Sequence, residues 1–168
     1  IAEGEIFVIM GLSGSGKSTL VRCLSRLIEP TGGQVLFDGT DLLSASDAEM
    51  IQIRRHKLGM VFQHFSLFDA LTVAENIALG MENAPKMGEL SEQIRKVSDT
   101  YGLPLSPDRI VGDLSAGERQ RVEIIRCLLQ EPKLLIMDEP TAALGPQEIE
   151  QLHAAGVRRD ADAARRQL

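Results

Sequence analysis

The chain has 168 residues, a length that favours one domain with its own buried core over a two-domain enzyme. Eighteen Lys and Arg residues against 24 Asp and Glu residues give a net charge of −6, which disfavours a protein that binds nucleic acid through bulk positive charge. With 43% hydrophobic and 25% charged residues the composition is that of a folded protein, and no apolar run approaches the about 18 residues of a membrane-spanning helix.

The N-terminal part of the chain predicts a strand, a loop and a helix in that order. Residues 6–10 form a continuous apolar run, which is typical of a strand buried on both faces of a parallel sheet. A loop rich in Gly and Ser follows at 11–16. From Lys17 apolar residues recur with helical spacing as far as Ile28, and Pro30 ends the predicted helix.

A hairpin, a short helix and a second strand are predicted next. Residues 35–40 surround an Asp38-Gly39 pair, which is typical of a tight antiparallel turn. Ser46 stands in the position of an N-cap and predicts a short helix after it. Residues 58–62 form a short apolar strand, and Gln63 follows at its C-terminal edge.

The remaining pattern is mainly helical until the sheet resumes. Helices are predicted over 73–79, about 90–101 and 116–130, with a loop at 102–113, and they form a helical insertion. Residues 134–137 predict a buried strand, and a further helix begins near Pro146. We therefore expect an α/β fold with a core sheet, a small antiparallel β piece and a helical insertion.

The loop after the first predicted strand matches the phosphate-binding pattern G-x-x-x-x-G-K-S/T in the strand-loop-helix context that this motif requires. Glycines let backbone N–H groups converge on an anion, and the following helix contributes partial positive charge at its N-terminus. Lys17 is expected to reach the β- and γ-phosphates, and the Ser18 hydroxyl to bind Mg²⁺. The predicted ATP-binding residues are Gly11, Leu12, Ser13, Gly14, Ser15, Gly16, Lys17, Ser18 and Thr19. A flexible Gly/Ser turn, the alternative, explains neither the lysine nor its placement.

Two carboxylates follow the strand at 134–137. Asp138 is expected at the carboxyl edge of a parallel sheet, where it suits a Mg²⁺ ligand. Side chains of adjacent residues diverge at a strand end, so Glu139 is expected to face the attacking water as general base. Two acids that open an ordinary loop are the alternative interpretation of this pair.

Ser115 and Glu118 open the longest predicted helix, and their spacing predicts a capping box. That explanation of the helix start holds whatever the function is. A capped helix N-terminus with Gly117 beside it can also receive a γ-phosphate.

The order of these motifs resembles that of an ABC transporter ATPase domain over about residues 3–152. The phosphate loop, Gln63 after an apolar strand, the segment Leu114–Glu118 and the segment Leu134–Pro140 carry the resemblance. It implies a P-loop NTPase fold of the ABC ATPase type, incomplete here, with a core at 1–63 and 131–152 and a helical subdomain at about 64–130. Residues 153–168 form an atypical tail rich in Ala and Arg.

The family resemblance also implies roles for the site residues. Two such domains pair head to tail, so that the signature residues Ser115, Ala116, Gly117 and Glu118 contact the ATP held by the partner. Gln63 touches Mg²⁺ and the attacking water, and the catalytic set is Glu139, Gln63 and Lys17, with Ser18, Gln63 and Asp138 at the metal. Residues 64–71 face transmembrane permease subunits.

The function implied is Mg²⁺-dependent ATP hydrolysis that powers solute import. The partners are a second ATPase domain and the permease subunits, with no nucleic acid, and the place is the cytoplasmic side, peripheral at the inner face of the membrane. Residues 4–39 resemble glycine betaine and proline importers, whereas 61–147 resemble sugar and nucleoside importers. The family's usual Leu-Ser-Gly-Gly-Gln differs here at Ala116 and Glu118, and the usual D-loop aspartate is Gly145.

Two alternative functions are kept open. The adenine-stacking aromatic of the family has no counterpart among the four residues before Glu5. The switch histidine has none either, because His153 lies too close to Glu139. A truncated nucleotide-binding fragment with little or no turnover is therefore one alternative. A soluble, non-transporter ABC-type ATPase is the other, and the acidic net charge disfavours it.

Overall fold

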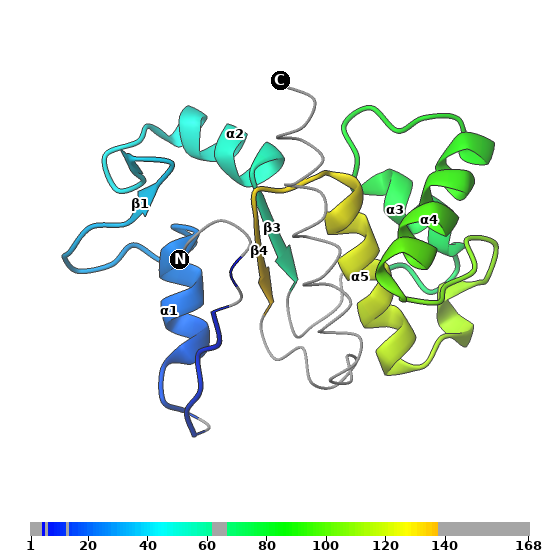
Figure 1. The fold of residues 1–168 in the computed structure, drawn as a ribbon, viewed down its shortest axis with the longest axis horizontal. Helices are drawn as coiled ribbons and strands as arrows, with labels where there is room; N and C mark the ends of the chain where they lie inside the picture. The colour runs from blue at the N-terminus through cyan, green and yellow to red at the C-terminus, as the bar shows by residue number, and fades with distance from the viewer. Residues whose placement is uncertain (1–4, 6, 13, 62–66, 138–168) are drawn as a thin grey trace.

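The computed structural model describes residues 5, 7–12, 14–61 and 67–137, which form a mixed α/β chain (Figure 1). Its elements are α1 (Lys17–Leu24), β1 (Leu36–Phe37), β2 (Thr40–Asp41), α2 (Asp47–His56), β3 (Leu58–Val61), α3 (Val73–Leu79), α4 (Met87–Tyr101), a 3-10 turn (Val111–Asp113), α5 (Ala116–Leu129) and β4 (Leu134–Met137). Within these ranges no helix combines the length and apolar character needed to cross a membrane.

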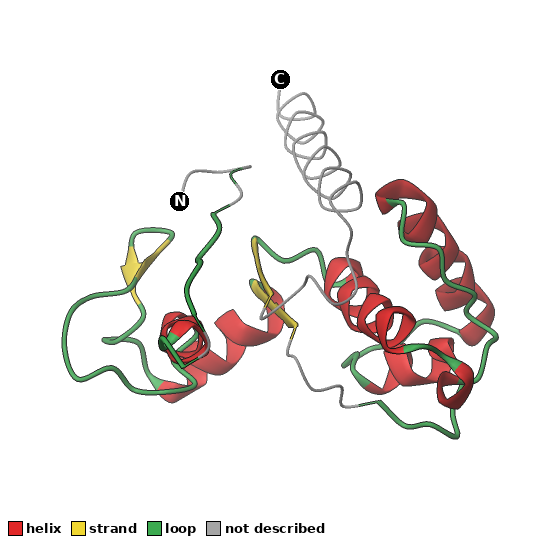
Figure 2. Cartoon of the chain, turned by 90° about the horizontal axis from the view of Figure 1, so that it is seen from below, coloured by secondary structure: helices red, strands yellow, loops and turns green. Residues whose placement is uncertain are grey.

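The β3–β4 pair lies at the centre of the arrangement. In Figure 1, α1 and the β1–β2 hairpin lie on one side of it and α3, α4 and α5 on the other, and Figure 2 shows the same separation from below. The two strands are parallel, with Leu58 opposite Leu134 and Val61 opposite Met137. A parallel pair needs a long crossover connection, and α3 to α5 supply it. The strands predicted at 58–62 and 134–137 are confirmed over Leu58–Val61 and Leu134–Met137, and so is the α/β class.

The three helices of the crossover share one apolar core. Its members with no exposed surface are Val61 of β3 and Val73, Ile77, Leu90, Ile94, Leu103, Val111, Val122, Ile124 and Ile125. On α4 the buried positions recur every three or four residues, the spacing of one helix face. The three helices predicted for the insertion are confirmed with small shifts at their ends, since α4 begins at Met87 rather than near residue 90 and α5 ends at Leu129. The helix predicted from near Pro146 lies outside the described residues.

The β1–β2 hairpin confirms the turn predicted at Asp38 and Gly39. Both residues have positive φ, 49° and 75°, as this tight turn requires. Asp41 stabilises the hairpin because its Oδ1 accepts hydrogen bonds from the backbone N–H of Val35 at 3.3 Å and of Leu43 at 3.1 Å.

The run predicted as a buried strand over 6–10 is not a strand in its described part, residues 7–10. Phe7 and Val8 are each 63% exposed and Met10 is 86% exposed. Among the described strands β4 pairs with β3 alone. A strand forms only where a neighbour accepts and donates its backbone hydrogen bonds, and an apolar run does not specify that neighbour.

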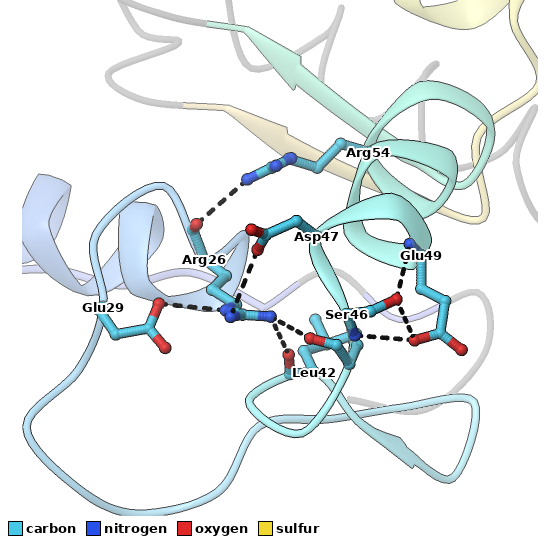
Figure 3. A network of polar contacts seen from close by, with 8 residues as sticks. Arg26, Glu29, Leu42, Ser46, Asp47, Glu49 and Arg54 are labelled. Atoms are coloured by element: carbon cyan, nitrogen blue, oxygen red, sulfur yellow. Dashed lines mark hydrogen bonds and ion pairs between the residues drawn. The ribbon is translucent and has the colours of Figure 1, made fainter.

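The first helix ends at Leu24, earlier than the prediction to Ile28, because Arg26 takes a left-handed conformation with φ of 51°. Figure 3 shows why this conformation is held. The Arg26 guanidinium donates to the carbonyls of Leu42 and Ala45, and its own carbonyl accepts from Arg54 at 3.1 Å. These bonds tie the segment after α1 to the segment before α2 and to the last turn of α2.

Candidate functional site

The phosphate-type loop curls around the ammonium group of Lys17. The Lys17 Nζ donates to the carbonyl oxygen of Gly11 at 2.7 Å and of Leu12 at 2.9 Å, and it lies 3.5 Å from the Ser15 Oγ. The backbone N–H of Ser15 donates back to the Leu12 carbonyl at 3.1 Å. The positive charge is therefore held inside the bend of the loop, at the beginning of α1.

Three glycines make this bend possible. Gly14 and Gly16 have φ of 78° and 87°, a region that side chains with a Cβ rarely adopt. A Cβ on Gly11 would lie 2.5 Å from the Ser15 Oγ, so a larger residue there would displace the serine.

The start of α1 is suited to an anion. Gly16 is its N-cap and has no side chain to cap the first N–H groups of the helix. Ser18 is half-buried and Thr19 is exposed in the first turn. A helix N-terminus and a lysine beside it together favour a polyphosphate over a neutral ligand. This agrees with the sequence pattern.

The second part of the candidate site is the start of α5, where the predicted capping box is present. The Ser115 Oγ accepts from the Glu118 N–H at 3.3 Å, and the Glu118 Oε2 accepts from the Ser115 N–H at 2.9 Å and from its hydroxyl at 2.8 Å. Ala116 is exposed and Gly117 half-buried beside them. These interactions fix the first turn of α5 in a single geometry.

A cation that the sequence did not single out completes this turn. The Arg109 guanidinium pairs with the Glu118 Oε1 and donates to the Asp113 carbonyl at 3.1 Å. Hydrogen bonds from the N–H and hydroxyl of Ser115, followed by that of Arg109, lower the pKa of Glu118 to about 2. Glu118 is therefore a carboxylate throughout the physiological pH range.

Arg119 links the start of α5 to the segment after β3. Its guanidinium pairs with Asp69 at 2.6 Å and donates to the carbonyls of Leu114 at 3.3 Å and Gly112 at 3.4 Å. The Gly112 N–H donates to the Asp69 carbonyl at 2.9 Å. Arg109 and Arg119 had no signal in the sequence, because their partners are set by how the 102–113 loop folds back.

Figure 1 shows how these parts are placed. The loop before α1, the start of α5 and the carboxyl ends of β3 and β4 lie towards the same, lower edge of the view, with the two helix starts on opposite sides of the strand pair. Ser13, Gln63, Asp138 and Glu139 lie outside the described residues. The strand that precedes Gln63 ends at Val61, and the strand that precedes Asp138 ends at Met137. These two last residues are opposite each other in the sheet.

Comparisons with known proteins agree with this arrangement. Residues 1–142 match the family described as ABC transporter. The chain is 52% identical over 149 residues to the glycine betaine/proline betaine transport system ATP-binding protein ProV of Escherichia coli, which covers 87% of this chain and 37% of ProV. It is 47% identical over 148 residues to the methionine import ATP-binding protein MetN of Desulfitobacterium hafniense, with 88% and 43% covered. The chain thus spans about two fifths of these curated relatives.

Solved structures give the same result for the fold. A dimeric post-hydrolysis state of the ATP-binding cassette MJ0796 bound to ADP and Pi aligns with a TM-score of 0.76 and 35% identity, over 92% of this chain and 69% of that one. The cbiO1 protein from Clostridium perfringens, part of the ABC transporter complex cbiONQ, aligns with a TM-score of 0.74 and 30% identity, over 96% and 64%. The expected fold class is confirmed.

Proposed function

This chain belongs to the ABC transporter family, and on that premise we propose that it is the ATP-binding part of a solute import system that binds and hydrolyses Mg-ATP as a head-to-tail dimer. The observation that carries the proposal is the Lys17 ammonium, held within a glycine loop at the N-terminus of α1. A positive group in that setting is suited to the β- and γ-phosphates of a nucleotide.

The loop binds ATP by exchanging its internal contacts for phosphate contacts. Lys17 gives up the Gly11 and Leu12 carbonyls and pairs with phosphate oxygens, while the N–H groups of the loop surround the phosphates. The Ser18 hydroxyl and the Asp138 carboxylate, with Gln63, would hold Mg²⁺, since oxygen ligands are what this ion prefers. When bound, the ion neutralises charge on the transferred phosphoryl group.

Hydrolysis needs a group that orients and activates water. We assign this role to Glu139 as general base, with Gln63 beside the water. The two residues follow β4 and β3, whose last paired residues are Met137 and Val61. Parallel strands whose ends are in register place the residues that follow them at one edge, which supports the assignment.

The second chain supplies the start of α5. Ser115, Ala116, Gly117 and Glu118 contact the nucleotide held by the partner. In one chain the starts of α1 and α5 lie on either side of β3 and β4 (Figure 1). A nucleotide that contacts both a phosphate loop and a signature turn would therefore take these two parts from different chains. The MJ0796 cassette, which is dimeric with ADP and Pi bound, supports this arrangement.

The names of the relatives support the proposed role in transport. Both ProV and MetN are named as ATP-binding proteins of transport or import systems, and we extend this role to the present chain. The segment 64–71 then contacts permease subunits at the inner, cytoplasmic face of the membrane. No nucleic acid takes part.

A nucleotide-binding piece with little turnover is the second candidate. The exposure of Phe7, Val8 and Met10 favours it, because these residues give the phosphate loop no buried support on its N-terminal side. A loop with a loose support would bind ATP but position it poorly for hydrolysis.

Phosphate release from Mg-ATP, measured over a range of protein concentrations, tests the proposal. We expect a rate per chain that rises with concentration and is lost in Lys17→Ala and in Glu139→Gln. Lys96→Ala, an exposed lysine on α4, is the matched control and should retain the rate. ATP binding without phosphate release in the unsubstituted chain would favour the second candidate, and no ATP binding would contradict both.

A further inference from the structure

Hydrogen bonds hold both the backbone and the side chain of Arg109. Its carbonyl accepts from the Val73 N–H at 2.9 Å, at the start of α3. Its guanidinium then reaches forward to the Glu118 carboxylate and the Asp113 carbonyl, nine and four residues along the chain. The backbone of Arg109 and the end of its side chain are therefore both held by hydrogen bonds.

The charge of Glu118 is not needed for capping. The capping box uses Oε2 as an acceptor for the N–H and hydroxyl of Ser115, and a glutamine oxygen serves equally well in that position. The remaining oxygen, Oε1, faces Arg109. Hydrogen bonds from Ser115 and Arg109 keep the pKa of Glu118 at about 2, so the turn carries a full negative charge.

A negative charge at this position conflicts with the ligand of the proposed dimer. The first turn of α5 would face the terminal phosphate of an ATP held by the partner, and two anions repel each other strongly where water is partly excluded. The Glu118 side chain is 25% exposed and that of Arg109 is 44% exposed, so the pair lies at the surface that a partner would cover.

We propose that Arg109 is a positioning residue that cancels the charge of Glu118, and so lets the start of α5 accept the terminal phosphate of a nucleotide bound by a second chain. This inference rests on the proposed function. Without Arg109 the Glu118 carboxylate would keep its place in the capping box but would repel the phosphate. With Arg109 present, the turn presents the N–H groups of α5 without a net negative charge.

The test is a double-mutant cycle. Arg109→Met is made in the unsubstituted chain and in a chain that also carries Glu118→Gln, and kcat and KM for ATP are measured with the ATP-dependent self-association constant. We expect Arg109→Met alone to raise KM and weaken self-association about tenfold, the effect of one uncompensated charge near a phosphate in a partly screened site. In the Glu118→Gln chain the same change should alter either value less than about twofold.

Two further variants separate charge from structure. Arg109→Lys keeps the charge without the planar fork, so most of the affinity for ATP should be retained. Arg95→Met is the matched control. It removes the α4 partner of an exposed ion pair with Asp108, and no change in KM is expected. Unfolding of each variant is followed by circular dichroism, so that a folding defect is recognised.

The contrary results are distinct. Equal losses from Arg109→Met in both backgrounds, or a loss that Arg109→Lys does not restore, would overturn the charge-cancelling role and leave a structural one. No effect of Arg109→Met in a chain that hydrolyses ATP would overturn the inference alone. Absence of ATP-dependent self-association in the unsubstituted chain would overturn the dimer of the proposed function, and this inference with it.

Discussion

Asn76 is predicted to hold the segment after β3 in place, and Asn76→Ala tests this directly. Its side chain is buried, with 4% of the residue exposed. The Oδ1 accepts from the Phe68 N–H at 2.8 Å, and the Nδ2 donates to the carbonyls of Phe68 and Thr72, each at 3.0 Å. An alanine has no group to replace these bonds.

The loss can be worked out from these contacts. Each of these three bonds contributes about 1 kcal/mol net, and the longer contact of Nδ2 with the Leu71 carbonyl at 3.4 Å adds little, so the sum is about 3 kcal/mol. Phe68 is 61% exposed, so water can reach part of the freed backbone, and we expect a decrease of about 2 kcal/mol in the free energy of unfolding. Urea unfolding followed by far-UV circular dichroism measures it, with an unchanged slope of free energy against urea.

The matched control is Asn83→Ala, an exposed asparagine between α3 and α4, for which a change below about 0.5 kcal/mol is expected. A loss for Asn76→Ala as small as that of the control would show that Asn76 does not hold this segment. Full stability of Asn76→Asp beside a large loss for Asn76→Ala would also contradict the prediction. Asp keeps the acceptor but lacks the donor, so the donor bonds would then contribute nothing.

The other predictions concern the two helix starts and the core. The pKa of Glu118 falls from 4.5 to about 2 on folding, so its ionised form stabilises the folded chain fully above pH 4.5 and loses this effect as the pH falls towards 2. Glu118→Gln should flatten that part of the acid unfolding curve, and an unchanged curve would contradict this. Gly16→Ala, at φ of 87°, should cost about 1 kcal/mol and weaken ATP binding in a fluorescence titration, and unchanged binding would count against the loop geometry. Ile94→Ala should lower the free energy of unfolding by about 2–4 kcal/mol in a urea titration, because the side chain is fully buried; a loss below about 1 kcal/mol would contradict the packing. Asp69→Asn should cost below about 1 kcal/mol because its carboxylate is mostly exposed, while Arg119→Met should cost more because two backbone carbonyls also lose their donor, and the reverse order would be inconsistent with the structure.

Local signals in the sequence predicted the features that local interactions decide. The Ser115 and Glu118 capping box, the Asp38-Gly39 turn and the helix start at Lys17 depend on residues within four positions of each other. Such patterns determine backbone hydrogen bonds directly, so the predicted starts of these two helices and the position of the turn agree with the observed ones. The apolar spacing on α4 likewise gave its buried face, although its start at Met87 has no side-chain cap that could have marked it.

Features that depend on distant partners were not predictable in the same way. The apolar run before the phosphate loop was predicted to be buried, but Phe7 and Met10 are exposed, because burial of a strand requires a neighbour that no local pattern names. The Arg119–Asp69 pair joins residues 50 positions apart, and it exists because the 3-10 turn brings the two segments together. The roles of Glu139 and the other residues outside the described part stay predictions.

Complementation between two inactive chains tests the shared nucleotide site most directly. Lys17→Ala removes the phosphate lysine from one chain, and Ser115→Arg blocks the start of α5 in the other. In a head-to-tail dimer the mixed pair retains one intact site, made of the loop of the second chain and the α5 start of the first. We expect almost no phosphate release from either variant alone and about a quarter of the unsubstituted rate per chain from an equal mixture, since half of randomly formed dimers are mixed and each mixed dimer has one of two sites intact. A mixture no more active than its separate components would contradict a nucleotide site shared between two chains.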